Sequence, residues 1–232
     1  GRMSGDVLVA GKTVSQQASG FGDPMLEFDI NLIGPRSQKN IPDAIRYEPG
    51  FSLDLLVDLA LPIGEYDNTK QLNIGQNRWY GRVGAPTIIQ IGPWVPGRRT
   101  TIEFLPAVWF FGENKDFFGT QSGQTKKTDA MFQLDAHLTR DFTENAWGAL
   151  DATWFSGGQN TIDGNKVGGK VNNLAFGATL GYTVNDNMAL TFSYKSTVND
   201  TAPGDLSMNS FMFTLIYGWH PMIQGMNRLK GQ

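Results

Sequence analysis

The sequence predicts an all-β protein, a transmembrane antiparallel up-and-down β-barrel. Three observations favour this class: apolar and polar residues alternate at period two, short and long connections alternate along the chain, and aromatic residues gather where the predicted strands end. In an outer-membrane barrel the apolar face of each strand meets lipid and the polar face lines the lumen. A soluble β-barrel or sandwich, the alternative architecture, has its apolar faces inside.

The clearest strand pattern covers residues 51–63. Its odd positions are all apolar, whereas its even positions include Ser52, Asp54 and Asp58. Strict alternation predicts an extended strand, because a helix would place both aspartates on one face with large aliphatic residues between them. About nine segments of roughly ten residues, the length of a tilted membrane strand, follow the same rule. The others are residues 25–33, 79–91, 101–111, 130–138, 146–155, 174–182, 188–194 and 211–219.

The connections between these segments alternate between short and long. Outer-membrane barrels have short periplasmic turns and long external loops, and a sandwich has no reason to put every long loop at one end. Residues 34–50 break the rule, since they are long on the short-turn side, and residues 41–49 are expected to form a helical turn across the periplasmic mouth. The short connections are residues 92–99, 140–145 and 184–187, and the long ones are residues 64–78, 112–128, 156–170 and 195–207.

Aromatic residues fall near both ends of the predicted strands. Two such girdles are typical of the two membrane–water interfaces, and the strand preference of aromatic residues alone does not explain their two-ended placement. The predicted girdle residues are Trp79, Trp94, Trp147, Trp154, Tyr182, Tyr194, Tyr217 and Trp219.

The polar faces predict a charged lumen. Arg82 lies on a strand between those of Asp58 and Glu103, so pairing across strands is feasible. The charges are expected either to hold the barrel rigid or to line a polar path whose acidic excess disfavours anions. The predicted lumen-lining residues are Glu27, Asp29, Asp54, Asp58, Arg82, Glu103, Asp135, His137, Asp151 and Lys195.

Two prolines on neighbouring strands bear on the wall of the barrel. Pro86 and Pro106 are candidate positions for a kink that would open an apolar portal, but a local adjustment of twist is the favoured interpretation.

Composition argues against other classes of function. The net charge of -3, without a basic cluster, gives no case for nucleic acid, and the absence of cysteine excludes a disulfide framework and a thiolate metal site. No run approaches the roughly 18 apolar residues of a transmembrane helix. Asp135 and His137 share a strand face, but no strained nucleophile motif accompanies them, so we predict no enzyme, cofactor or metal site.

Several ordered motifs resemble one family. Residues 20–34 (GFGDPMLEFDINLIG), 59–67 (LALPIGEYD), 72–79 (LNIGQNRW), 108–119 (VWFFGENKDFFG) and 150–158 (LDATWFSGG) are similar to the outer-membrane proteins of the meta-pathway of phenol degradation. The resemblance implies a twelve-stranded barrel. Proteins of this family are often encoded beside the enzymes that degrade aromatic compounds. It also implies that the barrel formed by residues 1–219 lacks its first strands and that residues 1–20 are an external loop. Residues 220–232 follow the last predicted strand and are expected to form a periplasmic tail.

These observations lead to two hypotheses of function. The first is a passive or substrate-specific channel in the bacterial outer membrane for small, aromatic or hydrophobic, molecules. The alternative is a structural scaffold whose lumen is filled with charges and which transports nothing. The expected partners are outer-membrane lipid and lipopolysaccharide, the barrel-assembly machinery and a small aromatic solute; the oligomeric state stays open.

Overall fold

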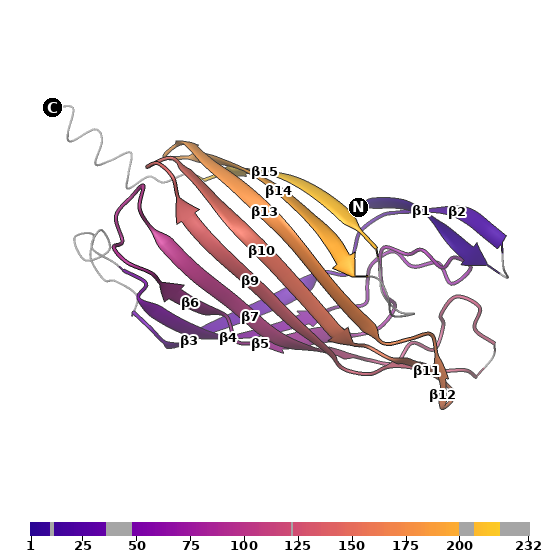
Figure 1. The fold of residues 1–232 in the computed structure, drawn as a ribbon. Coiled ribbons are helices and arrows are strands. Elements are labelled where there is room, and N and C mark those ends of the chain that lie inside the picture. The colour runs from indigo at the N-terminus through magenta and orange to yellow at the C-terminus, as the bar shows by residue number, and fades with distance from the viewer. Residues whose placement is uncertain (10–11, 36–47, 122, 200–206, 219–232) are drawn as a thin grey trace.

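A single curled antiparallel sheet dominates the computed structural model, which describes residues 1–9, 12–35, 48–121, 123–199 and 207–218 (Figure 1). Its ten strands follow the order β15-β14-β13-β10-β9-β7-β5-β4-β3, with β6 between β4 and β7. Strands that follow one another along the chain therefore pair, which confirms the predicted all-β antiparallel class. They are β3 (Met25–Ile33), β4 (Phe51–Ala60), β5 (Tyr80–Gly84), β6 (Thr87–Gln90), β7 (Thr100–Phe111), β9 (Met131–Asp141), β10 (Ala146–Gly157), β13 (Val171–Asn185), β14 (Met188–Asn199) and β15 (Asn209–Tyr217).

The two faces of this sheet differ in exposure in the predicted direction. On β4, Asp58 is 2% exposed, whereas its neighbour Leu59 is 40% exposed. At the centre of β10, Leu150 is 66% exposed, yet Asp151 is buried. We call the concave, polar face the inner face and the apolar face the outer face. Large apolar side chains that point away from the protein need an apolar surrounding, because a soluble fold would bury them.

The long connections gather at one end of the sheet and carry small sheets of their own (Figure 1). The three-stranded sheet consists of β8 (Lys126–Thr128), β11 (Asn160–Ile162) and β12 (Asn165–Val167), in the order β12-β11-β8. A hairpin of β1 (Arg2–Val9) and β2 (Lys12–Ser19) lies at the same end, so residues 1–20, predicted as an external loop, contain local strand pairing that was not predicted. The alternation of short and long connections did not reveal this local pairing.

The predicted strand over residues 79–91 was wrong in one respect, because it is interrupted and forms β5 and β6. Pro86 has no N–H to donate, so regular pairing stops there. The backbone hydrogen bonds nevertheless continue on both sides: Ala85 N donates to Pro106 O at 2.9 Å, and Asp54 N donates to Pro86 O at 2.8 Å. This closed arrangement fits a local adjustment of the strand better than an opening in the wall.

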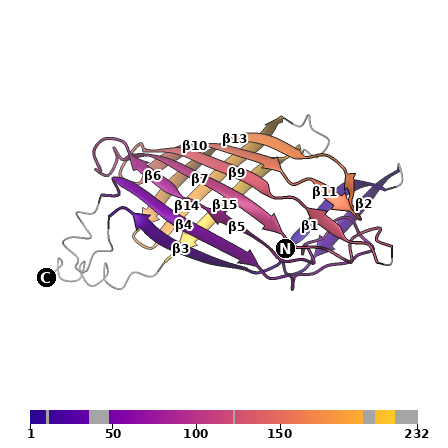
Figure 2. The same cartoon turned by 90° about the horizontal axis from the view of Figure 1, so that it is seen from below.

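The sheet curls strongly, so that β14 and β15 pass behind β4, β5 and β7 in Figure 2. β3 and β15 stand at the two ends of the strand order, and within the described residues they do not pair with each other. The expected helical turn over residues 41–49 and the tail over residues 220–232 lie largely or wholly outside the described residues. In the part of the chain that the structure describes, no helix is long and apolar enough to span a membrane.

Candidate functional site on the inner face

The pairing register places all ten predicted lumen residues on the inner face. Residues directly opposite each other on antiparallel strands point to the same side of the sheet, as do alternate residues of one strand. Lys195 lies opposite Gly177, which in turn lies opposite Asp151. Further opposed pairs are Glu27 with Asp58, Asp58 with Arg82, Glu103 with His137, and His137 with Asp151.

Burial differs among these residues according to their place in the sheet. Asp58 and Asp151 are buried because strands flank them on both sides. Glu27 and Asp29 are exposed because β3 is the last strand of the described sheet. Asp54 is half-buried and accepts a hydrogen bond of 2.6 Å from Asn31 Nδ2.

A network of charge pairs and hydrogen bonds, which we call the polar ladder, begins at Asp58. Arg82 Nε forms a salt bridge with Asp58 Oδ2 and is the only side-chain partner of this carboxylate within the described residues. Arg82 Nη1 also donates to Gln133 Oε1 at 3.2 Å, and Trp109 Nε1 donates to the same oxygen at 2.5 Å. The guanidinium carbon lies 5.1 Å from the centre of the Trp109 ring, in a cation–π contact.

The polar ladder continues across β9, β10 and β14. Gln133 Nε2 donates to Asp135 Oδ2, and Thr153 Oγ1 donates to Asp135 Oδ1 at 2.6 Å. Lys195 Nζ then donates to Thr153 Oγ1 at 2.7 Å. Six residues, Asp58, Arg82, Gln133, Asp135, Thr153 and Lys195, thus connect five strands from β4 to β14.

A second cluster lies beside the polar ladder around His137. Its Nδ1 is 2.5 Å from Asp151 Oδ1, while Thr179 Oγ1 donates to Asp151 Oδ2 at 2.7 Å. Thr179 and Ser193 share a further hydrogen bond of 2.9 Å. The threonine bonds to the carboxylate and not to the imidazole, so His137 is not placed to activate its oxygen as a nucleophile. The geometry is that of a satisfied polar cluster.

The sequence reasoning missed the neutral members of these networks. Gln133, Thr153 and Thr179 connect the charged residues, and Trp109 lies on the inner face although it is aromatic. Their position in the period-two pattern was the available signal: Gln133, Thr153 and Trp109 each stand an even number of residues from a predicted charged residue of their own strand. Thr179 lies opposite Ser193, two residues before Lys195. Residue type alone did not single them out.

Four of the predicted girdle residues lie on the outer face near strand ends: Trp79, Trp154, Tyr182 and Tyr217. Tyr194 is also on the outer face, but it lies in mid-strand because β14 continues to Asn199 beyond the predicted end at residue 194. Trp94 lies in a short connection, where the Arg99 guanidinium is 5.3 Å from its ring. Trp219 is outside the described residues.

The girdle prediction was wrong for Trp147. It lies on the inner face, because it shares its strand parity with Asp151 and is paired with Gly181. The indole covers this glycine so closely that an added Cβ would lie 2.0 Å from the ring. A position near a strand end does not determine which face an aromatic side chain takes.

A channel-like sheet, apolar outside and polar inside, is therefore the class of structure that the fold and the inner face define. The fold is similar to the crystal structure of an outer membrane channel from Pseudomonas putida F1, with a TM-score of 0.69 and 19% sequence identity over 87% of this chain and 67% of that chain. The predicted outer-membrane location agrees with this match, and the protein of similar fold is a channel, not an enzyme.

The sequence itself identifies the family. Residues 2–215 match the family described as "Putative MetA-pathway of phenol degradation", and the chain belongs to it. The predicted resemblance is thereby confirmed. No curated protein sequence matches the chain.

Proposed function

We propose that the protein is an outer-membrane channel through which small molecules, including aromatic or hydrophobic ones, cross along the inner face. The observation that carries the proposal is the division of the sheet, with apolar residues on the outer face and charged residues on the inner face. Such a division suits a wall between hydrocarbon and a watery lumen. The family name and the similarity to an outer membrane channel support the same function.

The proposed channel is a closed barrel of about twelve strands with the ten predicted lumen residues facing its interior. Unpaired backbone groups in hydrocarbon cost several kcal/mol each, so the free edges of β3 and β15 require strand partners in a membrane. We assign residues 1–219 to the barrel and residues 220–232 to a periplasmic tail. The outer face would contact lipid and lipopolysaccharide, and the last strand would be recognised by the barrel-assembly machinery.

The charges of the inner face are expected to make the channel select solutes by their charge. Carboxylates outnumber Arg82 and Lys195 among the proposed lumen residues, and a ring of acidic groups disfavours anions. Neutral and cationic solutes are therefore expected to pass more readily than anions through the middle of the barrel.

A structural scaffold is the second candidate, and the polar ladder favours it. Its salt bridge and hydrogen bonds connect five strands between β4 and β14, which suits a rigid wall as well as a conduction path. A channel and a scaffold of this fold would differ in whether solutes cross the membrane through them.

Solute flux separates the two functions. The full chain is reconstituted in liposomes, and swelling is measured with phenol, a neutral sugar and an organic anion. Ser193→Trp places bulk on the inner face and is expected to slow swelling, whereas Phe192→Trp, its neighbour on the outer face, is the matched control and is expected to leave the rate unchanged. Absence of flux for every solute would reject the channel and leave the scaffold.

A further inference from the structure

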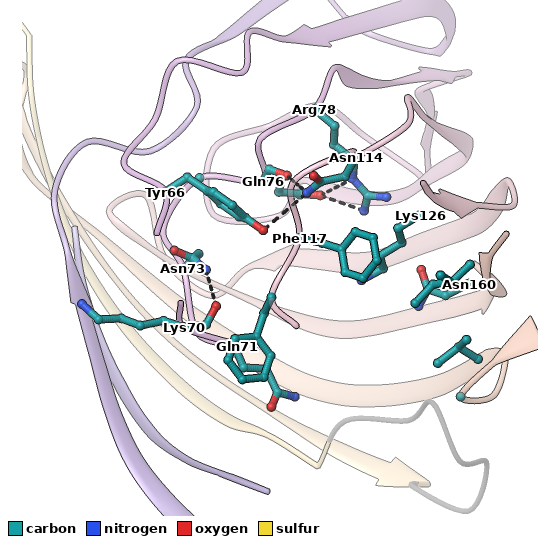
Figure 3. A pocket seen from close by; sticks show the side chains of 15 residues that line it. Tyr66, Lys70, Gln71, Asn73, Gln76, Arg78, Asn114, Phe117, Lys126 and Asn160 are labelled. Atoms are coloured by element: carbon teal, nitrogen blue, oxygen red, sulfur yellow. Dashed lines mark hydrogen bonds between the residues drawn. The ribbon is translucent and has the colours of Figure 1, made fainter. Parts of the chain in front are cut away.

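A cavity of about 530 Å³ lies at the long-connection end of the sheet (Figure 3). Three long connections build it: the one between β4 and β5 supplies Tyr66 and Arg78, the one between β7 and β9 supplies Phe117 and Lys126, and the one between β10 and β13 supplies Asn160. We call it the loop pocket. Its volume falls in the range of roughly 300–1,000 Å³ that is usual for sites that hold small molecules.

The loop pocket carries positive charge without a matching carboxylate. Among the described residues its charged lining side chains are Lys70, Arg78 and Lys126, and none of its lining side chains is acidic. Lys70 is neutralised by Asp67, with Nζ and Oδ2 3.2 Å apart. Arg78 and Lys126, in contrast, form no salt bridge with any described residue.

Arg78 is held in place by neutral groups. Its Nη2 donates to Gln76 Oε1 at 3.0 Å, its Nη1 donates to Thr128 Oγ1 at 2.5 Å, and its guanidinium carbon lies 4.7 Å from the centre of the Phe111 ring. Burial lowers the pKa of Arg78. A half-buried cation with no carboxylate partner among the described residues favours a bound anion.

The ammonium group of Lys126 is the second cation, and it has no fixed partner among the described residues. Within the described residues its ammonium group takes part in no hydrogen bond or salt bridge. Burial, and then the positive charge of Arg78, lower the pKa of Lys126. Two cations therefore face one cavity, and each makes the charge of the other more costly in the absence of an anion.

The remaining walls suit a flat apolar body. Phe117 is buried, and its ring lies beside Lys126 in Figure 3. Ile162 adds an aliphatic side chain. On the opposite side Asn114 is buried and fixed by its Nδ2, which donates to Gln76 O at 3.1 Å, and the Tyr66 hydroxyl lies 3.5 Å from the same nitrogen. Cations and polar groups thus share the cavity with an aromatic wall.

The loop pocket adjoins the inner face. Phe111, over which Arg78 lies, pairs with Tyr80. Tyr80 lies two residues before Arg82 on β5, and the Tyr80 and Trp109 ring centres are 6.3 Å apart. An aromatic column on the inner face therefore leads from the loop pocket to the polar ladder, so the cavity adjoins the inner face and not the outer face.

We propose that the loop pocket binds a small aromatic carboxylate, with its carboxylate between Arg78 and Lys126 and its ring against Phe117. Arginine can hold a carboxylate through two donors, and lysine supplies a point charge beside it. This inference rests on the proposed function in one respect, namely that the bound molecule is a solute of the channel. It names a class of solute that the long connections would concentrate at their end of the sheet, although the acidic excess of the inner face slows anions relative to neutral solutes.

Benzoate is the probe, and equilibrium binding to the purified full chain in detergent is the measurement. We expect saturable binding of benzoate and weaker binding of phenol, which is neutral at pH 7, and of inorganic phosphate, which lacks a ring. Lys126→Gln is expected to reduce benzoate affinity about ten-fold, the factor that corresponds to losing one charge-assisted hydrogen bond. Lys127→Gln changes the neighbouring exposed lysine, which pairs with Glu113 outside the pocket; it is the matched control and is expected to leave the affinity unchanged.

Each other outcome counts against the proposal. No saturable binding of benzoate to the unmodified protein, or equal affinity in Lys126→Gln, would reject the site. Phosphate that binds as tightly as benzoate would reject the aromatic ligand in favour of a general anion site, such as one for a phosphorylated headgroup. If Lys126→Gln does not fold, Lys126→Arg, which keeps the charge, must retain benzoate binding.

The proposed function fails separately from this inference. A protein that swells liposomes but does not bind benzoate remains a channel without the loop-pocket site. A protein that binds benzoate but conducts nothing keeps the site and loses the channel.

Discussion

The polar ladder and the loop pocket hold charge in opposite ways. On the inner face Asp58 meets Arg82, and Asp135 receives hydrogen bonds from Gln133 and Thr153, so the acidic groups have partners at fixed positions. In the loop pocket Arg78 and Lys126 have no carboxylate partner among the described residues. The first region uses its charges to join strands, and the second leaves charge available to a ligand.

The difference follows from the backbone that carries each region. Antiparallel strands place side chains opposite one another at regular spacing, so an arginine between two acidic strands is paired by the register alone. The long connections have no such register, and their side chains are positioned by individual hydrogen bonds such as that between Asn114 Nδ2 and Gln76 O. Loss of one partner of a charge pair on the inner face therefore lowers the stability of the fold. In the loop pocket, a cation without a partner among the described residues is instead the group that binds an anion.

The largest expected effect breaks the polar ladder at its first pair. Arg82→Met leaves the buried Asp58 without a counter-ion and should lower the free energy of unfolding by roughly 3–5 kcal/mol. Urea unfolding in lipid vesicles, followed by tryptophan fluorescence, measures it. Arg98→Met, in an exposed part of a short connection, is the control. Adding Asp58→Asn to Arg82→Met should restore part of the loss, and no recovery would mean that the pair is not what stabilises this region.

The next effect tests which face meets hydrocarbon. Leu150→Arg puts a charge at the centre of the outer face and is expected to cost roughly 2–4 kcal/mol in a bilayer. Ser193→Arg puts the same charge on the inner face and should cost less. Both are measured by the same unfolding assay. Equal costs for the two variants would contradict the assignment of the faces on which the comparison depends.

A smaller effect concerns the aromatic column between the two regions. Trp109→Phe removes the hydrogen bond to Gln133 Oε1 and should lower stability by about 0.5–1.5 kcal/mol. Trp154→Phe removes a hydrogen bond to Asn172 Oδ1 on the outer face and is the matched control, expected to cost less because its indole is solvent- or lipid-exposed. An equal loss in both would show that the inner position of Trp109 gives it no special role.

The smallest effect is a change in ion preference. Lys195→Met removes the base at the end of the polar ladder, so the inner face becomes more acidic and the reversal potential in planar bilayers should move toward cation preference. Lys127→Met changes an exposed lysine that pairs with Glu113 in a long connection and should cause no shift. A shift of the same size in both would place the selective region at the long connections and not on the inner face.

Regular alternation made the main sheet and its inner face predictable. Each of the ten charged residues that were predicted to line a lumen lies on the inner face of the sheet, because period two fixes the side of a strand without knowledge of its neighbours. Alternation could not predict which side chains of neighbouring strands form hydrogen bonds with each other. Gln133 and Thr153, which connect the charged residues of the polar ladder, were therefore not recognised. The girdle prediction failed at Trp147 because it used the position at a strand end, whereas the strand parity that Trp147 shares with Asp151 decides the face.

The long connections were the least predictable part of the chain. Their Gly, Asn and Asp content indicated solvated loops, yet β8, β11 and β12 pair there into a sheet. Nothing in the spacing of Arg78 and Lys126, which are 48 positions apart, indicated that they face one cavity. Contacts between segments so distant in sequence depend on the path of the whole chain.

The sequence by itself determined the strand class, the sense of each face and the family, because these depend on local periodicity and on ordered motifs. Only the tertiary structure decided which charges are paired and which are left for a ligand, because electrostatic pairing depends on distances between strands and loops that the linear order does not contain.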